Sequence, residues 1–227
     1  MGEALFDLSA EYRQMLNQGL RLSGENQEFF IRGRVDSLRA HLPRNFAVRR
    51  VLDFGCGIGT ATNHLAETYP NAEIVGVDTS ENALDHAREH YGSSRVRFRP
   101  LSALSIESGF DLCYVNGVFH HIDPPSRIAA VESIRRALRD GGRLALFENN
   151  PWNPGTRMVM SRIPFDRDAI PLSPPTAKRL VRAAGFKKPF IAWSLFYFPR
   201  PLGFLRFTEG PLGSLPLGAQ YCVLVTK

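Results

Sequence analysis

The stretch VLDFGCGIGT, residues 51–60, decides the fold of this chain. It begins with a short apolar run typical of a buried strand, and glycines follow at positions 55, 57 and 59. Glycines in such a turn permit positive φ angles and keep side chains away from a ligand that approaches the backbone. The stretch therefore predicts a strand, a ligand-binding loop and then a helix.

Strands and helices alternate on both sides of this loop. The hydrophobic periodicity predicts strands at 49–55, 72–78, 95–100, 110–117 and 143–149, and helices at 8–22, 27–42, 60–69, 80–92 and 126–142. We expect Ser80 to cap the helix 80–92 and Gly92 to close it. Prolines interrupt the pattern after residue 150, where we expect one helix at 176–185 and strands at 189–198 and 219–227. Such alternation is typical of a mostly parallel sheet covered on both faces.

Length and composition favour one domain. The chain has 227 residues, 44% of them hydrophobic, which is enough for one sizeable core. We expect an N-terminal helical cap at 1–45, a central core at 46–150 and substrate-side segments with the last strands at 151–227. The three cysteines are far apart and odd in number, which fits a reducing cytoplasm better than disulfides or a metal site. No secretion signal or membrane-spanning run is expected, so the predicted location is cytoplasmic.

The net charge of +6 is concentrated in the C-terminal part of the chain. Residues 1–100 hold 12 Lys and Arg against 13 Asp and Glu, whereas the remainder holds 16 against 9. A basic excess can attract a nucleic acid or an acidic substrate, but no long basic run or basic–aromatic tract accompanies it. A solvated face of arginines is the favoured interpretation, and nucleic acid is disfavoured as a partner.

The spacing of the glycines separates two kinds of nucleotide-binding loop. Dinucleotide-binding loops follow the pattern G-x-G-x-x-G, whereas here Gly55, Gly57 and Gly59 alternate and Asp53 precedes them. This arrangement resembles the first motif of class I S-adenosylmethionine-dependent methyltransferases, acidic-x-G-x-G-x-G. The segments FDLCYVNGVFHHI (110–122) and LRDGGRLALFE (138–148) are similar to that family's fourth-strand and fifth-strand segments. The resemblance therefore covers most of residues 46–150.

The resemblance implies a fold, a cofactor and the residues that hold it. The fold would be a Rossmann-like, three-layer αβα sandwich whose seven-stranded, mostly parallel sheet has one antiparallel C-terminal strand. Asp78 stands where the family places an acid on the two ribose hydroxyls, both of which one carboxylate can accept. Ser102 stands where the family often has an acidic contact to adenine. The implied site for S-adenosylmethionine comprises Asp53, Gly55, Cys56, Gly57, Gly59, Asp78, Thr79, Ser102, Ala103 and Asn116.

Several of these residues also have a purely structural interpretation. Asp53 and Asp78 can cap a turn or a helix, and Gly57 and Gly59 can serve helix–strand packing. Cys56 is favoured to pack as a small apolar residue rather than to react. Three glycines and two acids that arrive together at successive strand ends favour a cofactor site over coincidence.

The stretch LFENNPWNPGT, residues 146–156, contains half of a nucleic-acid methylation motif. Enzymes that methylate base amino groups resemble one another in an [Asn/Asp/Ser]-Pro-Pro-aromatic sequence after the fourth strand, but here NNPWN follows the fifth strand and has one proline. Ligands of open α/β sheets lie beyond the carboxyl ends of the strands. The candidates for the substrate wall are therefore Glu148, Asn149, Asn150 and Trp152. A proline-rigid connection whose asparagines bond turn backbone has nearly equal weight.

Three roles are open to His120 and His121, which follow the fourth strand. Adjacent histidines after a strand are expected to point in different directions, and no third ligand follows from spacing, so no metal is expected. One imidazole could act as a general base, because it titrates near neutrality, and a structural role has at least equal weight. The candidate catalytic residues are His120, His121 and Glu148, and the candidate substrate-binding residues are Tyr12 of an N-terminal lid, Asn150 and Trp152.

Methyl transfer from a sulfonium is an in-line displacement, so the protein mainly aligns the acceptor with the methyl carbon and excludes water. The aromatic-rich C-terminal third predicts an apolar cavity with a few polar groups, suited to a small, partly aromatic or glycosidic acceptor in a biosynthetic pathway. The rival functions are a nucleic-acid methyltransferase, an NAD-dependent oxidoreductase and a cofactor-binding protein without catalysis. A monomer or a homodimer is expected.

Overall fold

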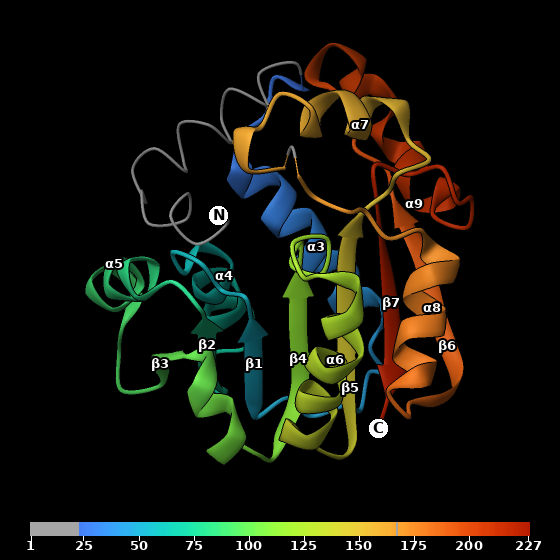
Figure 1. Cartoon of the computed structure of the whole chain (residues 1–227). Helices are drawn as coiled ribbons and strands as arrows, with labels where there is room; N and C mark the ends of the chain where they lie inside the picture. The colour runs from blue at the N-terminus through green and yellow to red at the C-terminus, as the bar shows by residue number, and fades with distance from the viewer. Residues whose placement is uncertain (1–22, 167) are drawn as a thin grey trace.

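The computed structural model describes residues 23–166 and 168–227 (Figure 1). The expected helix 8–22 and the candidate lid residue Tyr12 lie outside these residues. The elements in chain order are α3 (Gln27–His41), β1 (Arg50–Phe54), α4 (Thr60–Thr68), β2 (Glu73–Asp78), α5 (Glu81–Tyr91), β3 (Val96–Pro100), η2 (Leu101–Ile106), β4 (Phe110–Asn116), η3 (Pro124–Ser126), α6 (Arg127–Ala137), β5 (Leu138–Asn149), α7 (Pro154–Met160), η4 (Pro164–Asp166), α8 (Pro174–Ala183), β6 (Lys187–Leu195), η5 (Arg200–Thr208), α9 (Glu209–Leu212) and β7 (Gln220–Thr226). None of the helices in the described ranges combines the length and the apolar character that a membrane span requires.

Seven strands form one sheet in the order β3-β2-β1-β4-β5-β7-β6. Strands β1 to β5 pair in parallel, and β7 runs antiparallel to both of its neighbours. Helices α3, α4 and α5 cover one face, and α6 and α8 cover the other (Figure 1). The predicted three-layer sandwich with one antiparallel C-terminal strand is confirmed.

Two apolar cores lie on the two faces of this sheet, because alternate side chains of a strand point to opposite sides. On β4, Leu112 and Tyr114 pack in the core beneath α3, α4 and α5. Cys113 and Val115 pack in the core beneath α6 and α8. All four side chains are fully buried, so β4 lies at the centre of the molecule and its carboxyl end is held rigidly.

The boundary between α6 and β5 differs from the prediction because long-range pairing overrides local pattern. The helix expected to reach residue 142 ends at Ala137, and Leu138 already pairs with Phe110 of β4. Gly92 closes α5 as predicted: it has φ −63°, and its backbone N–H donates to the Arg88 carbonyl. Ser80 caps α5 as predicted, since its hydroxyl accepts a hydrogen bond from the backbone N–H of Ala83.

Helix α7 was not predicted, because its prolines were taken as breaks. Pro154 in fact occupies the first turn, where a helix needs no backbone N–H from it. Asn153 caps the helix by accepting a hydrogen bond from the Thr156 N–H at 2.9 Å. The sequence NPGT therefore begins a helix rather than ending one.

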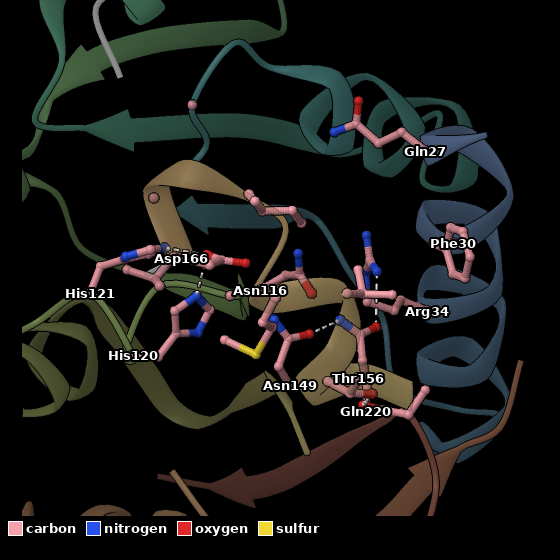
Figure 2. A pocket seen from close by; sticks show the side chains of 18 of the residues that line it. Gln27, Phe30, Arg34, Asn116, His120, His121, Asn149, Thr156, Asp166 and Gln220 are labelled. Atoms are coloured by element: carbon pink, nitrogen blue, oxygen red, sulfur yellow. Dashed lines mark hydrogen bonds and ion pairs between the residues drawn. The ribbon is translucent and has the colours of Figure 1, made fainter. Parts of the chain in front are cut away.

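At the carboxyl edge of the sheet, the segments after β1, β2, β4 and β5 surround one large pocket, part of which Figure 2 shows. Helix α3 forms a further wall and is fixed by polar and stacking contacts. The indole N–H of Trp193 in β6 donates to Ser37 Oγ at 2.7 Å, and the Trp193 ring stacks on His41 with centroids 3.7 Å apart. The far end of α3 is thereby anchored to an edge strand.

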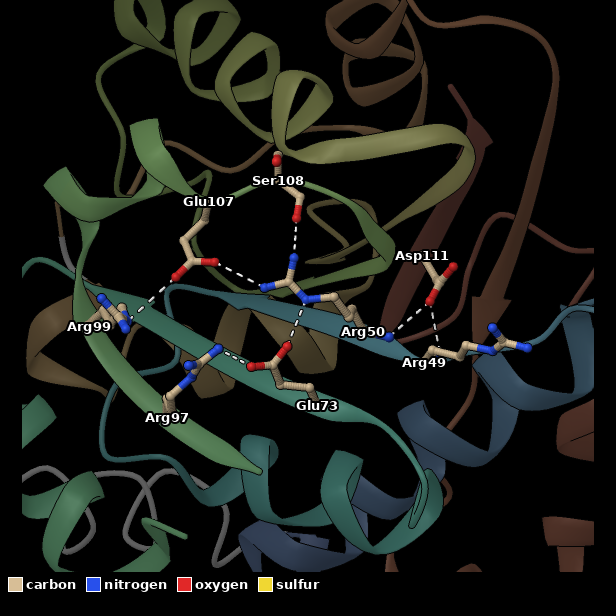
Figure 3. A network of polar contacts seen from close by, with 8 residues as sticks. All are labelled: Arg49, Arg50, Glu73, Arg97, Arg99, Glu107, Ser108 and Asp111. Carbon is tan, nitrogen blue, oxygen red and sulfur yellow. Dashed lines mark hydrogen bonds and ion pairs between the residues drawn. The ribbon is translucent and has the colours of Figure 1, made fainter. Parts of the chain in front are cut away.

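At the opposite end of the sheet a charged network ties the amino ends of the strands together (Figure 3). The Arg50 guanidinium pairs with Glu73 at 2.8 Å and with Glu107 at 3.1 Å. Asp111 accepts the backbone N–H groups of Arg49 and Arg50, at 2.8 and 2.9 Å, and also pairs with Arg139. The Asp111 side chain is 9% exposed, so it satisfies backbone groups that water reaches poorly.

We expect Asp111→Ala to lower the free energy of unfolding by about 2–3 kcal/mol, because it leaves two backbone N–H groups and a guanidinium without their acceptor. Burial raises the pKa of Asp111, but hydrogen bonds from Arg139 and the two amides outweigh it and lower the pKa below 3.8. The stabilisation should therefore be present at neutral pH and fade as the pH falls below that value. Urea unfolding measures both effects. The fully exposed Asp140→Ala is the control, and an equal loss in both variants would contradict the proposal.

Candidate functional site

The pocket at the carboxyl edge has a volume of about 1290 Å³. On one side it is lined by the glycine loop, the end of β2 and the start of η2, through Gly55, Gly57, Val77, Asp78, Thr79 and Leu101. On the other side, here called the α7 side, it is lined by Asn149, Asn153, Thr156, Met158, Met160, Ile163 and Asp166. Residues of α3 and of the turn after β4 complete the wall (Figure 2).

Two glycines of the loop differ in the space around them: a side chain would not fit at Gly55, whereas the space beside Gly57 is open. Gly55 has φ +74°, and a Cβ there would overlap the Val118 side chain. A Cβ on Gly57 would meet no atom within 4 Å, so the backbone at this position faces the open pocket. The loop therefore offers a bare stretch of backbone to a ligand.

Asp78 connects this loop to the next helix. Its carboxylate accepts the Gly57 N–H at 2.7 Å and the Ser80 N–H at 3.0 Å. Each carboxylate oxygen can accept more than one hydrogen bond, so both retain capacity toward the pocket that Asp78 lines. Asp78 therefore holds the turn and still presents acceptor capacity to the pocket.

The lining of the described pocket does not include Asp53, Cys56 or Gly59. Each of these residues makes a structural contact instead. Asp53 is 2% exposed and accepts the Thr62 hydroxyl at 2.6 Å. Burial raises the pKa of the Cys56 thiol well above its ordinary value. Gly59 begins α4, and a Cβ there would lie 2.9 Å from Ala87. These residues shape the loop from beneath.

Ser102 and Ala103 were expected to contact the cofactor, but the described pocket lining does not include them. The backbone turns into η2 at this point, and Ser102 lines a separate cavity of about 430 Å³. The preceding residue, Leu101, lines the main pocket instead. The described pocket therefore has an apolar side chain, Leu101, one residue before the predicted polar contact. Thr79 does line the pocket.

His120, His121 and Asp166 form a cluster between the turn after β4 and η4 (Figure 2), and Glu148 joins it from behind His120. Glu148 is fully buried and accepts the Phe119 N–H at 2.7 Å and His120 Nδ1–H at 2.6 Å. The other ring nitrogen of His120, Nε2, lies 3.5 Å from Asp166 Oδ1, and His121 Nε2 lies 3.3 Å from the same oxygen. The expectation that the two histidines point apart was wrong, because η4 brings Asp166 to both.

The charges in this cluster depend on one another. Burial alone would lower the pKa of His120, but the carboxylates of Glu148 and Asp166 outweigh it and raise the pKa to about 10. Burial raises the pKa of Asp166, but hydrogen bonds from His120 and His121 outweigh it and lower the pKa. The space between Glu148 and Asp166 therefore favours positive charge. His120, His121 and Asp166 line the pocket, whereas Glu148 lies behind His120.

Asn150 and Trp152 do not form the substrate wall of the described pocket. Asn150 is fully buried, donates to the carbonyls of Pro216 and Gly218 at 2.9 Å, and accepts the Trp152 N–H at 3.1 Å. Trp152 is 46% exposed. The alternative of an asparagine that satisfies turn backbone is the correct one for Asn150, while Asn149 and Asn153 line the pocket.

A chain of polar side chains crosses the floor of the pocket from α3 to β5 (Figure 2). Arg34, 6% exposed, donates to the Tyr114 hydroxyl at 3.1 Å and to Gln220 Oε1 at 3.0 Å. Gln220 in turn donates to Asn149 Oδ1 at 2.9 Å. Arg34 could not be singled out from the sequence, because an arginine in a helical pattern gives no sign that it is buried.

Comparisons with known proteins agree with this geometry. Residues 51–142 match a family model described as "Methyltransferase domain". The trans-aconitate 2-methyltransferase of Afipia carboxidovorans is 28% identical over 167 residues, which are 73% of this chain and 61% of that protein. The corresponding protein of Methylobacterium nodulans is 32% identical over 148 residues, 65% of this chain and 54% of that protein. The chain therefore spans little more than half the length of these relatives.

Solved structures show the same fold. A Thermotoga maritima protein described as a SAM-dependent methyltransferase and possible histamine N-methyltransferase has a TM-score of 0.69 at 19% identity, with 100% of both chains covered. A SAM-dependent methyltransferase from Archaeoglobus fulgidus has a TM-score of 0.65 at 17% identity, with 89% of this chain and 95% of that chain covered.

The sheet order, the alternating glycines and the acid after β2 define a Rossmann-like methyltransferase fold with its ligand pocket at the strand reversal. Residues 51–142 carry the matched methyltransferase domain, and the chain is similar to class I S-adenosylmethionine-dependent methyltransferases in sequence and in fold. The comparisons thus support the resemblance that the glycine loop suggested.

The residues present fit S-adenosylmethionine. Asp78 keeps acceptor capacity for ribose hydroxyls, and Gly57 leaves space for the ligand against the backbone. Asn116 Oδ1, at the end of β4, is buried and has no hydrogen-bond partner among the described residues. A buried acceptor without a partner calls for a donor from a ligand, such as an ammonium group. Asp78, Gly57 and Asn116 would therefore hold the cofactor.

Asp53 should make stability depend on pH in a direction opposite to Asp111. Burial raises the pKa of Asp53 from 3.8 to about 7, against the opposing hydrogen bond from Thr62. The folded protein thus holds a proton that the unfolded chain releases, so this contribution is full below pH 3.8 and is lost as the pH rises toward 7. Relative to Asp53→Asn, the wild type should lose roughly 2–3 kcal/mol of unfolding free energy between pH 5 and pH 8.

Urea unfolding at the two pH values measures this difference. The exposed Asp36→Asn on α3 is the control and should show no such change. A wild-type curve parallel to that of Asp53→Asn would show that Asp53 is ionised throughout.

Proposed function

We propose that this chain transfers a methyl group from S-adenosylmethionine to a small-molecule acceptor bound on the α7 side. The observation that carries the proposal is one continuous pocket of about 1290 Å³ from Asp78 to Asn149. Pockets for a single small ligand have roughly 300–1000 Å³. The pocket is therefore large enough for a cofactor and an acceptor together.

The cofactor, when bound, supplies an activated methyl group on a sulfonium with a good leaving group. The chain's own residues orient the reactants: Asp78 accepts the ribose hydroxyls, and Asn116 accepts a donor at the end of β4. Because β4 is fully buried on both faces, Asn116 is held rigidly. Positioning of this kind accounts for most of the acceleration that a displacement needs.

The acceptor we favour is a small polar molecule that carries a carboxylate. The buried Arg34 lines the pocket, and a guanidinium is suited to bidentate contact with a carboxylate. Met158 and Ile163 add apolar surface on the α7 side. Two similar proteins are named trans-aconitate 2-methyltransferase, so trans-aconitate is the first acceptor to test. Aromatic and glycosidic acids come next, because Phe196 also lines the pocket.

We place the acceptor's reacting group beside the cluster of His120, His121 and Asp166, which lines the same pocket. Glu148 is a positioning residue in this proposal, since it touches His120 and not the pocket.

We further propose a cytoplasmic, biosynthetic role. The three cysteines support a reducing environment, since all are free and buried.

Isothermal titration with S-adenosylhomocysteine tests the cofactor site. The wild type should bind it and should not bind NAD. Asp78→Ala should weaken binding by about 1–3 kcal/mol, a loss of roughly 5- to 150-fold, because buried hydroxyls lose their acceptor. Asp140→Ala, whose side chain is fully exposed, should bind as the wild type does. Equal affinity in the two variants would remove Asp78 from the site.

A methyl-transfer assay with trans-aconitate and related acids tests the acceptor site. Arg34→Met should raise KM for a carboxylate acceptor by roughly tenfold or more, because a charge-assisted hydrogen bond is lost, while the affinity for S-adenosylhomocysteine changes little. Arg32→Met on the same helix is the control, since that side chain is 64% exposed. Methylation of RNA or DNA, with small acids untouched, would overturn the proposed substrate class.

A further inference from the structure

We propose that His120, His121 and Asp166 form a binding site for one divalent transition-metal ion on the wall of the pocket. The three residues come from two segments, the turn after β4 and η4. One ligand atom of each lies within 4.8 Å of the others. All three residues line the pocket, so an ion bound there would meet the acceptor.

The distances within the cluster are long for hydrogen bonds and match the edges of a coordination shell. Asp166 Oδ1 lies 3.3 Å from His121 Nε2 and 3.5 Å from His120 Nε2. Hydrogen bonds from ring nitrogens to oxygen usually span about 2.7–3.2 Å. Ligand atoms about 2.1 Å from a tetrahedral Zn²⁺ lie roughly 3.4 Å from one another. The ligand atoms of the three residues lie within 4.8 Å of one another, so the widest separation would have to shorten by rotation of an imidazole when an ion binds.

Glu148 fixes His120 in the form that a metal ligand needs. Its carboxylate accepts His120 Nδ1–H at 2.6 Å and is itself held by the Phe119 N–H at 2.7 Å. With Nδ1–H held by Glu148, Nε2 faces Asp166, and it becomes the ligand atom when an incoming cation displaces the second ring proton. A carboxylate behind a histidine is a frequent arrangement in metal sites, where it orients the ring and strengthens the ligand.

The charges and the accessibility of the cluster suit a cation. Two carboxylates, of Glu148 and Asp166, flank His120, and their side chains are 0% and 5% exposed. The His121 side chain is 22% exposed, which leaves a path for an ion from the pocket. Two imidazoles and one carboxylate suit Zn²⁺, Co²⁺, Ni²⁺ and Fe²⁺, and disfavour the all-oxygen shells of Mg²⁺ and Ca²⁺.

Three protein ligands leave at least one position for another molecule, as catalytic metal sites do. That position would take an oxygen of the acceptor and lower the pKa of its hydroxyl or orient its carboxylate. This last step rests on the proposed function. Binding of the ion itself does not, since it depends on the side chains alone.

Titration of the chelator-treated full chain with Co²⁺ and with Zn²⁺ tests the site. We expect one equivalent of either ion to bind, with the visible absorption bands of Co²⁺ in a four- or five-coordinate site. His121→Ala and Asp166→Asn should abolish this uptake. Glu148→Gln should weaken it by roughly 10- to 100-fold, because the His120 ring loses its orientation. Unfolding temperature and affinity for S-adenosylhomocysteine check that each variant is folded.

His90→Gln is the matched control, because His86 and His90 stack on the surface of α5 and could hold an adventitious ion. It should bind one equivalent as the wild type does. No uptake by the wild type, or uptake lost in His90→Gln and kept in His121→Ala, would overturn the proposal. If Asp166→Asn does not fold, the more exposed His121→Ala decides. S-adenosylhomocysteine titrated into the chelated protein tests the cofactor site separately, so failure of one proposal is distinguishable from failure of the other.

Discussion

The reversal of strand order beside β1 is the constraint on which the rest of the site depends. The chain passes from β1 to β2 on one side and later places β4 on the other, so the two loops leave the sheet in opposite directions. At Gly55 the two loops come so close that any side chain would overlap Val118. The crevice is therefore lined by backbone at its narrowest point, and it widens toward β5. In the proposed function, cofactor and acceptor meet in this space, which the sheet topology leaves open.

Buried carboxylates near this crevice behave differently because their partners differ. Asp53 has a hydroxyl as its partner, and burial raises its pKa to about 7. Asp166 has two imidazoles, and its pKa is lowered despite burial. Asp78 bonds backbone N–H groups and still faces the pocket. Burial alone does not determine whether a carboxyl group is charged, because the hydrogen-bond donors around it also shift its pKa.

Local pattern predicted the sheet, the glycine loop and Asp78, because each depends on residues close together in the chain. It failed where distant segments meet. Leu138 belongs to a strand because Phe110 pairs with it. Asp166 contacts His121 although the two residues are 45 positions apart, and nothing in the sequence near either residue indicates the contact. The segment between them contains α7, which the prolines made difficult to predict. The buried Arg34 also owes its place to partners on β4 and β7.

The two walls of the pocket have separate origins in the chain. The glycine loop and Asp78 belong to the first strands, whereas the α7 side is one contiguous segment, residues 149–166, held to the rest through Asn150 and the backbone at 216–218. Helix α3 is anchored independently through Trp193. Residues 149–166 thus carry most of the α7 side in one contiguous segment, so substitutions at its pocket-facing positions other than Asp166 would change that wall and leave the glycine loop and Asp78 as they are.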